Sequence, residues 1–299
     1  MMAGILGTKL SPALSDYIQG IDVQALSRIG ADRLSERAIP NIGLIELVSA
    51  RDFASRYDAL YIKEFPKQAE RERTDLIISR LTAQFAGQRV GLAPYHVVGI
   101  RDSKGDAIGA AQFSVLPVKD SSFAVPYLQY IYVRRENRRQ DMSEVLHTMT
   151  LAITLADAKK MGNRTVPFTL FETEPPGYGD DEESRAFSRM RAQVHSKGGA
   201  TAVVLMKEGQ QISPHVQPGL EVGDPPLSLV WAIRKSPSPG HEWNISDIGD
   251  KLMAAYYQSL RDEGFPEENI RLAESIVKER CKGSTWILIP LDEVTFHIV

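Results

Sequence analysis

Short apolar runs in the first half of the chain have the length and composition of β-strands. They occupy residues 43–48, 95–101, 107–116 and 126–133. The second and third runs are separated by turn-forming residues at 102–106, so we expect these two strands to form an antiparallel hairpin. Helical patterning lies between the first two runs, from 50 to 65 and again, after a proline, to about 87. These patterns predict the order strand, two helices, three strands.

Directly after residue 133, the apolar period changes from strand-like to helical. Five apolar residues recur at helix spacing: Met142, Leu146, Met149, Ile153 and Ala156. Lys159 and Lys160 fall in the last turn, where the helix dipole favours positive charge, and Gly162 is a typical stop. The sequence therefore predicts one long helix that follows the strand at 126–133 and ends before Gly162.

The second half of the chain continues with strands and helices. Strands are predicted at 165–172, 201–206 and 227–234 and in TWILIPL near the end, and helices at 181–197, at 245–264 and from Pro266 onward. Residues 1–41 have broken helical patterning and are interpreted as an N-terminal arm, and SPSPG at 236–240 as a linker. We therefore predict a main domain at 42–235 and a C-terminal helical extension at 241–299 that packs on it.

Charge and cysteine content exclude several classes of protein. The chain of 299 residues has a formal net charge of -3 and a pI of about 6.1, which gives no general attraction for nucleic acid or an anionic membrane. The single cysteine excludes an intrachain disulfide framework, and the six histidines lack metal-site spacing. No signal sequence and no apolar run of ~18 residues is present. We expect a cytoplasmic protein without metal, nucleic-acid or membrane partners.

The segment from Val133 to Leu146 carries the clearest chemical signal. A strand end is followed by four arginines (Arg134, Arg135, Arg138 and Arg139) and then by a helix start. Unpaired backbone N–H groups at a helix N-terminus bind phosphate well, and arginines add charge-assisted contacts. The alternative is a solvated turn whose arginines pair with nearby Asp and Glu residues. The residues alone leave both interpretations open.

The spacing of this segment resembles the main motif of the GNAT superfamily of acyl-CoA N-acyltransferases. In that motif, a valine ends the fourth strand and is followed, after four residues, by Arg or Gln. Two residues later comes Gly, then one residue, then Gly or Ala, and a helix leucine lies three further on. This chain has Val133, Arg138, Asp141, Ser143 and Leu146 at those places. The resemblance implies a site that binds acyl-CoA and holds its pyrophosphate. The residues implied to bind this co-substrate are Ile131, Val133, Arg138, Arg139, Gln140, Asp141, Met142 and Ser143.

Both glycine positions of the motif differ in this chain, and Asp141 is the more serious difference. In the family, small residues there let the backbone approach the pyrophosphate. With Glu144 three residues on, Asp141 would instead form a capping box, in which its carboxylate binds the N–H groups that a phosphate would use. Two interpretations therefore remain, a pyrophosphate site and a helix end sealed by its own side chain.

The resemblance extends beyond this motif. The predicted element order over about 42–235 is similar to the GNAT order, and FETEPP (171–176), HSKGGA (195–200) and HVQPGL (215–220) look like a bacterial subgroup. The implied fold is α+β (an α/β three-layer arrangement), with a bent mixed β-sheet flanked by helices. The implied co-substrate is acetyl-CoA or another acyl-CoA, the implied acceptor is a small-molecule or peptide amine, and a homodimer is an open expectation.

Three residues are candidates for catalysis in such an enzyme, in which a free amine attacks the thioester directly. Glu172 lies on a predicted strand and could serve as the base for the ammonium proton. His195 stands four residues before Gly199, where the family often has a tyrosine that protonates the leaving thiolate. Tyr127 shares a strand face with Val133, close to the expected acceptor position. For each residue, ordinary packing or solvent exposure is the alternative.

The sequence thus supports a CoA-dependent N-acyltransferase, most simply an acetyltransferase. A second hypothesis is a GNAT-fold protein without turnover that binds CoA, another ligand or a protein partner. Asp141, Ser143 and the missing tyrosine favour that second hypothesis. A third, in which the arginines grip a nucleic-acid backbone, conflicts with the acidic pI.

Overall fold

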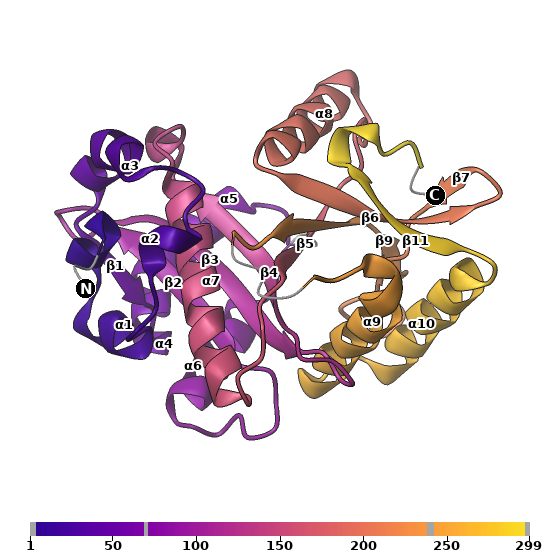
Figure 1. Ribbon diagram of the computed structural model, residues 1–299, viewed down its shortest axis with the longest axis horizontal. Helices are drawn as coiled ribbons and strands as arrows, with labels where there is room; N and C mark the ends of the chain where they lie inside the picture. The colour runs from indigo at the N-terminus through magenta and orange to yellow at the C-terminus, as the bar shows by residue number, and fades with distance from the viewer. Residues whose placement is uncertain (1–3, 69–70, 238–241, 297–299) are drawn as a thin grey trace. The chain divides into compact units, whose positions relative to one another are not determined.

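The structure is a computed structural model that describes residues 4–68, 71–237 and 242–296 (Figure 1). The chain divides into two compact units. Unit 1 comprises the residues up to Val115, Phe123–Val166 and the short stretch that begins at Ser236, and unit 2 comprises Leu116–Ser122, Pro167–Lys235 and the C-terminal part of the chain. The predicted linker at 236–240 lies partly outside the described residues. The predicted division into an arm (1–41), a main domain (42–235) and a C-terminal extension (241–299) stays a prediction.

Four strands form the sheet of unit 1. They lie side by side in the order β1 (Leu44–Leu47), β2 (Tyr95–Arg101), β3 (Ala107–Pro117) and β4 (Ala124–Val133). The predicted hairpin is confirmed, because β2 and β3 pair antiparallel with Tyr95 opposite Ser114. Most side chains of β2 and β3 are buried, which explains why these strands read as nearly continuous apolar runs.

The helices of unit 1 are short, with two exceptions. They are α1 (Pro12–Tyr17), α2 (Val23–Leu26), α3 (Ala31–Arg37), α4 (Ala50–Asp52), α5 (Asp58–Glu64), α6 (Thr74–Phe85) and α7 (Met142–Lys160), with 3-10 turns at Ile5–Lys9, Ile39–Asn41 and Arg135–Asn137. The predicted continuous helix at 50–65 is interrupted by one π-helical turn, Phe53–Tyr57. That turn buries Phe53 and Tyr57, and the Tyr57 hydroxyl donates a 2.8 Å hydrogen bond to Glu46.

Helix α7 is buried on nearly all sides, more than its single apolar stripe predicts. One side packs on β4 and β2, and α2 of the N-terminal arm packs against it as well. The extra burial includes Thr150 and Thr154, whose hydroxyls donate to carbonyls four residues back in the same helix. These two hydroxyls are therefore satisfied within α7, whereas the buried hydroxyl of Thr148 has no hydrogen-bond partner among the described residues.

The N-terminal arm is an integral part of unit 1. Leu10 forms an isolated parallel bridge with Ile45 of β1, and the amide of Ser11 donates to the Ile45 carbonyl at 2.8 Å. The side chains of Leu6, Leu14 and Leu34 are almost completely buried. The arm therefore covers one side of unit 1 and contributes to its hydrophobic core.

Unit 2 is built on a second set of strands. Their order is β5 (Phe168–Thr173), β10 (Val230–Lys235), β6 (Ala200–Lys207) and β11 (Thr285–Pro290), with β7 (Gln210–Ile212) also on β6, and β8 (Val216–Gln217) and β9 (Leu227–Ser228) form a separate pair. The strands from β5 to β11 pair antiparallel. Strand β11 comes from the C-terminal segment, so this segment is not only a helical extension. It supplies a strand of the sheet.

Helices cover both faces of the unit 2 strands, as Figure 1 shows. Helix α8 (Glu182–Lys197) lies on one face, and α9 (Ile245–Asp262) and α10 (Glu267–Cys281) lie on the other. The predicted α+β class, a β-sheet flanked by helices, is thus confirmed. Most strands and helices begin within a few residues of where the apolar periods predicted them. Helix α6 is an exception, because it begins at Thr74 and not directly after Pro66.

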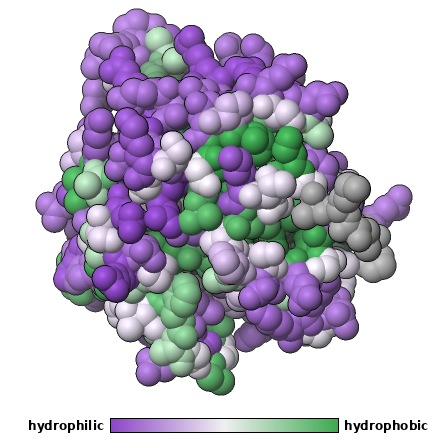
Figure 2. Space-filling model, turned by 90° about the vertical axis from the view of Figure 1, so that its left-hand side faces the viewer, coloured by the Kyte–Doolittle hydropathy of each residue, from purple (hydrophilic) through white to green (hydrophobic). Residues whose placement is uncertain are grey.

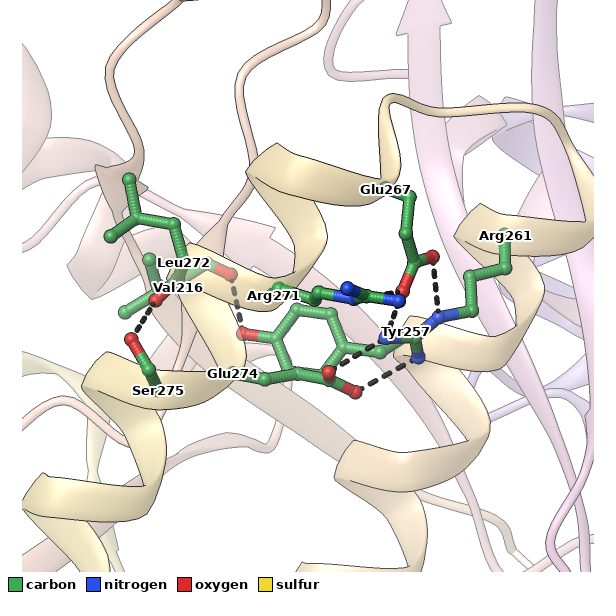
Figure 3. A network of polar contacts seen from close by, with 8 residues as sticks. All are labelled: Val216, Tyr257, Arg261, Glu267, Arg271, Leu272, Glu274 and Ser275. Carbon is green, nitrogen blue, oxygen red and sulfur yellow. Dashed lines mark hydrogen bonds and ion pairs between the residues drawn. The ribbon is translucent and has the colours of Figure 1, made fainter.

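Ion pairs join α9 to α10 (Figure 3). Arg261 contacts Glu274 at 2.7 Å and Glu267 at 2.9 Å, and Arg271 contacts Glu267 at 2.9 Å. Between them, the Tyr257 hydroxyl donates a 2.7 Å hydrogen bond to the carbonyl of Val216 in β8. The two helices are therefore linked to each other by charge and to the β8 strand by a buried tyrosine.

The surface mixes polar and apolar residues. The face drawn in Figure 2 is largely hydrophilic in its upper part and has hydrophobic residues near its centre. Within the described ranges, no helix is both long and apolar enough to cross a membrane. Those same ranges contain no group of three or more His, Cys, Asp or Glu residues arranged to hold a metal ion.

Candidate functional site

The segment between β4 and α7 has an unusual backbone. A 3-10 turn, Arg135–Asn137, follows the strand, and Arg138 is extended. Arg139 and Asp141 then have positive φ angles of 63° and 59°. Non-glycine residues seldom adopt this left-handed conformation, which is the one that glycine accepts at no cost. Asp141 therefore holds a backbone conformation that a glycine would adopt without cost.

The side chain of Asp141 does not cap α7, so the capping-box interpretation is wrong. Helix α7 begins at Met142 with no side-chain cap hydrogen bond. The Asp141 carboxylate instead accepts two hydrogen bonds of 2.8 Å from Arg33 and lies 3.5 Å from Nε of Arg37. The hydrogen bond from Arg33 lowers the pKa of this carboxyl below its usual value. The charge of Asp141 is thus balanced by the N-terminal arm.

The N-terminal arm makes two further contacts with this segment. Arg37 donates to the carbonyl of Arg139, and the amide of Arg28 donates to Glu144 Oε1 at 2.9 Å. These contacts could not be predicted from the sequence, because the arm and the loop are far apart along the chain. Arg33 and Asp141 are separated by 108 positions. The only signal was the spacing of Arg33 and Arg37, which places both on one face of a helix.

Some of the arginines in the segment are paired with acidic side chains. Arg134 contacts Asp102 at 3.2 Å and Asn137 at 2.8 Å, and Arg138 pairs with Glu64. The interpretation of a turn with paired arginines is therefore correct for these two. Arg139 is exposed, and no ion pair involves its side chain within the part of the chain that the structure describes. The loop retains positive charge from Arg139 and from the arm.

The end of β4 lies against β3 at a glycine position. A Cβ atom on Gly109 of β3 would meet the Tyr132 carbonyl at 2.4 Å and the Val133 Cα at 3.2 Å. The amide of Arg134 donates to the Ile108 carbonyl at 2.7 Å. Glycine at 109 is therefore required for the close approach of β3 to Val133. Of the other predicted residues on β4, Ile131 is half-buried and Tyr127 is 6% exposed.

Unit 2 contains the other two predicted catalytic residues, and it does not bring them together. His195 packs against Phe171 with ring centroids 5.0 Å apart. Glu172 is the next residue in β5, so its side chain points to the opposite face. Trp231, which is paired with Glu172 across β10, shares that opposite face. Glu172 and His195 therefore lie on different faces of the unit 2 strands.

The electrostatic surroundings of His195 limit its chemistry. Burial, with Arg191 and Arg234 nearby, lowers the pKa of His195 to about 4. At neutral pH the ring is then almost entirely neutral. A neutral imidazole is a weak proton donor to a thiolate, whereas an imidazolium is a good one. His195 is therefore poorly suited to the acid role that its position suggested, although its N–H can still donate a hydrogen bond.

Glu172 has a partner that the sequence did not reveal. Its Oε1 lies 2.7 Å from Nε2 of His215, whose side chain is 0% exposed, whereas that of Glu172 is 14% exposed. The neighbouring Glu174 lies beyond the end of β5 and pairs with Arg191 at 2.8 Å. Because His215 follows a loop and is distant in sequence, no spacing rule could have linked it to Glu172. The pair places a carboxylate, backed by an imidazole, near the surface of unit 2.

Comparisons with known proteins find similar proteins among solved structures only. No protein-family model and no curated protein matches the chain. Among solved structures, a GNAT-family acetyltransferase from Staphylococcus aureus Mu50 matches with a TM-score of 0.34 and 12% identity, over 64% of this chain and 98% of that one. A Corynebacterium glutamicum protein, described as a histone acetyltransferase and related acetyltransferase, matches with a TM-score of 0.32 and 12% identity, over 66% of this chain and 98% of that one.

A third similar structure is the glucosamine N-acetyltransferase region of a fungal multi-domain β-N-acetylglucosaminidase. Its TM-score is 0.36 with 17% identity, and the match covers 55% of this chain and 18% of that one. The chain thus spans less than a fifth of that multi-domain protein. All three matches are to proteins described as acetyltransferases, but with TM-scores below 0.5 they carry no conclusion about activity. The function of this chain is therefore inferred from its own residues, which resemble the GNAT motif.

Proposed function

We propose that this protein is a CoA-dependent N-acyltransferase that transfers an acyl group, most simply acetyl, from acyl-CoA to an amine. The observation that carries the proposal is the loop between β4 and α7. It keeps the spacing of the GNAT motif from Val133 to Leu146, and Asp141 adopts the left-handed conformation that the motif's glycine provides. The side chain of Asp141 is turned to Arg33, so it does not seal the start of α7.

This arrangement supports phosphate binding in a specific way. The start of α7 presents backbone N–H groups and a partial positive charge, which favour an anion. Asp141 would oppose an anion, but Arg33 and Arg37 balance its charge. The residues proposed to bind acyl-CoA are Ile131, Val133, Arg138, Arg139, Gln140, Asp141, Met142 and Ser143. Among these, the contribution expected from Val133 is its backbone N–H, directed at the thioester oxygen.

In the proposed reaction the amine and acyl-CoA are held together and react directly. Glu172 is the proposed base for the ammonium proton, and its partial exposure is compatible with that role. Tyr127 is proposed to contact the acceptor, although it is almost fully buried. His195 remains the candidate nearest the family's acid position, but its low pKa makes a hydrogen bond, rather than proton donation, its plausible contribution.

Thermal unfolding in the presence of CoA and acetyl-CoA tests the binding part of this proposal. A ligand that binds only the folded state stabilises it by RT ln(1 + [L]/Kd), so an increase in Tm that grows with ligand concentration is expected. Adenosine and inorganic phosphate are tested alongside, so that binding of a nucleoside or a simple anion is distinguished. No shift with millimolar acetyl-CoA would contradict the proposal.

Release of the CoA thiol from acetyl-CoA in the presence of a panel of primary amines tests turnover. The second candidate, a CoA-binding module without turnover, is favoured by the low pKa of His195, which removes the expected thiolate acid. That candidate predicts a Tm shift with acetyl-CoA and no thiol release above the rate without protein. An acetyltransferase predicts both signals with at least one amine.

A further inference from the structure

We propose that His215 is the positioning residue of Glu172, and that together they form the carboxylate–imidazole pair that accepts the proton of the acceptor's ammonium group. This inference rests on the proposed acyltransferase function. Nε2 of His215 lies 2.7 Å from Oε1 of Glu172, within the distance of a charge-assisted contact. His215 is completely buried and Glu172 is partly exposed, so only the carboxylate can reach a substrate.

Aromatic residues fix the orientation of the His215 ring. Trp231 stacks on it, with centroids 5.0 Å apart and planes inclined by 14°, and Tyr256 packs edge-on at 5.0 Å and 81°. Trp231 is also the residue of β10 that lies opposite Glu172. The imidazole therefore cannot rotate away from the carboxylate without opening the core around two buried aromatic rings.

The backbone that carries His215 is fixed from several sides. The His215 amide donates to Ser213 Oγ at 3.2 Å, and the Tyr257 hydroxyl of α9 holds the next residue, Val216, through its carbonyl at 2.7 Å (Figure 3). From α10, Arg280 donates to the Ser213 carbonyl at 3.1 Å. Helices α9 and α10 thus hold the His215 segment in place, which gives the C-terminal part of the chain a role in the site.

The surroundings of the ring indicate that His215 orients the carboxylate and does not relay a proton onward. Both ring nitrogens of His215 are buried, and within the described ranges neither has a hydrogen bond of acceptable geometry, so Nε2 meets Glu172 Oε1 as a close polar contact of 2.7 Å and Nδ1 has no partner. A proton on Nδ1 would therefore be buried without an acceptor, which is costly in an apolar environment. Without a partner at Nδ1, the ring has no acceptor to which it could pass a proton onward, so its contact with Glu172 serves to position the carboxylate. Ionisable groups of the neighbouring α9 and α10 around this segment include Tyr256, which packs on the ring, Tyr257, which donates to Val216, and Arg280, which donates to Ser213.

The chemical step balances without a further reagent. The ammonium group of the acceptor gives one proton to the Glu172 carboxylate, and the freed lone pair attacks the thioester carbonyl. A carbon–nitrogen bond forms, the carbon–sulfur bond breaks, and the thiolate leaves with its electron pair. The second proton of the attacking nitrogen goes to the thiolate, and Glu172 returns its own proton to solvent. The products are the amide, CoA thiol and one proton.

Imidazole nitrogen resonances provide a test that needs no acceptor. Long-range ¹H–¹⁵N spectra are recorded for the full chain, with His215→Phe used to assign the His215 signals. Glu172→Gln is expected to move the Nε2 signal of His215 and to leave that of His96 in place. His96 is a matched control, because it is equally buried and lies 2.8 Å from a different carboxylate, Asp157. A His215 signal unchanged in Glu172→Gln would overturn the pairing.

Steady-state kinetics with acetyl-CoA and the amine panel test the positioning role. His215→Phe keeps the aromatic packing and is expected to lower kcat by about tenfold or more, with KM for acetyl-CoA changed less than about twofold. His215→Gln, whose amide N–H can still face the carboxylate, is expected to recover part of that loss. The control His96→Gln is expected to alter stability and not kcat.

The two proposals fail in different ways. If the wild type neither shifts in Tm with acetyl-CoA nor releases thiol with any amine, the acyltransferase function is wrong and this inference falls with it. If the wild type turns over and His215→Phe retains its kcat, the function stands and the positioning role is wrong. A kcat loss accompanied by an equal loss of the acetyl-CoA Tm shift would indicate a general structural defect, and would also overturn the positioning role.

Discussion

Each unit buries a histidine against a carboxylate, yet the two pairs are built differently. In unit 1, His96 and Asp157 are 2% and 3% exposed, and the Asp157 carboxylate also accepts a hydrogen bond from Tyr17. In unit 2, His215 is fully buried, but Glu172 is 14% exposed. The first carboxylate is closed off by two protein partners, while the second remains within reach of a small molecule.

The difference separates a structural carboxylate–imidazole pair from a candidate reactive one. Tyr17 belongs to the N-terminal arm, so the Asp157 pair joins that arm to α7, and Lys160 lies over the Tyr17 ring at 3.8 Å. A carboxylate with both oxygens engaged and almost no exposure cannot accept a proton from a substrate. Burial of a histidine and carboxylate is thus not a sign of function by itself, and the exposure of the carboxylate decides between the roles.

Removing each carboxylate should give the largest contrast between the pairs. Asp157→Ala leaves His96 and the Tyr17 hydroxyl buried without their partner, so the free energy of unfolding should fall by about 3 kcal/mol. Glu172→Ala should lower it by about 1 kcal/mol, because solvent can partly replace the lost contact. Urea unfolding at pH 7 measures both values. Equal losses for the two variants would break the distinction between a closed and an open pair.

Removing only the tyrosine hydroxyl should sharpen the comparison within unit 1. Burial, together with the hydrogen bond to Asp157, raises the pKa of Tyr17 well above its usual value, so the hydroxyl is a donor at all ordinary pH values. Tyr17→Phe should therefore lower the free energy of unfolding by about 1.5 kcal/mol. The same change at the exposed Tyr178 should have no measurable effect. If Tyr17→Phe leaves the free energy of unfolding unchanged, the hydrogen bond between the arm and Asp157 does not contribute to stability.

His195 is half-buried and has no carboxylate partner among the described residues, and it should make stability depend on pH. Its folded-state pKa of about 4 lies below the usual value of 6.5, so the unfolded chain binds more protons between these values. Stability should therefore be full above about pH 6.5 and decline as the pH falls towards 4. In His195→Gln this part of the decline should disappear from urea unfolding curves measured between pH 7 and 4. An unchanged pH dependence would contradict the low pKa.

Asp141 is paired with an exposed arginine and not with a buried partner, and its replacement should have the smallest effect on stability. Asp141→Gly removes the cost of a left-handed aspartate and also loses the contact with Arg33, whose side chain is 54% exposed. These two effects on stability oppose each other, and each is worth about 1 kcal/mol or less. The free energy of unfolding should therefore change by less than about 1 kcal/mol. Asp141→Asn keeps the conformation and removes the charge. Both variants should increase the Tm shift with acetyl-CoA if the loop binds pyrophosphate.

A comparison of these two variants identifies the reason for any tighter binding. An equal gain in both would mean that the negative charge of Asp141 opposes the ligand. A gain confined to Asp141→Gly would mean that the Cβ atom obstructs the close approach of the phosphate. Weaker binding in both would show that the contact of Asp141 with the arm is needed to shape the loop, and would contradict the expected site.

The order of strands and helices could be predicted from the sequence because it depends on local periodicity. The strand that ends at Val133 and the helix from Met142 to Lys160 follow from a change of apolar period at a single point. The hairpin of β2 and β3 follows from the turn residues between them. The interruption of the helix at 50–65 by a π turn could not be predicted, because a single extra residue in a helical turn leaves no clear periodic signal.

The sequence by itself determined the candidate loop, through the spacing from Val133 to Leu146, and it identified Glu172 as a candidate base. Only the tertiary structure decided that Asp141 faces Arg33 and not the start of α7. It also decided that His195 and Glu172 lie on opposite faces and that His215 lies against Glu172. The physical reason is that periodicity records which side of its own element a residue occupies, whereas charge partners are brought together by the folding of distant segments. A carboxylate's role depends on those partners and on its remaining exposure.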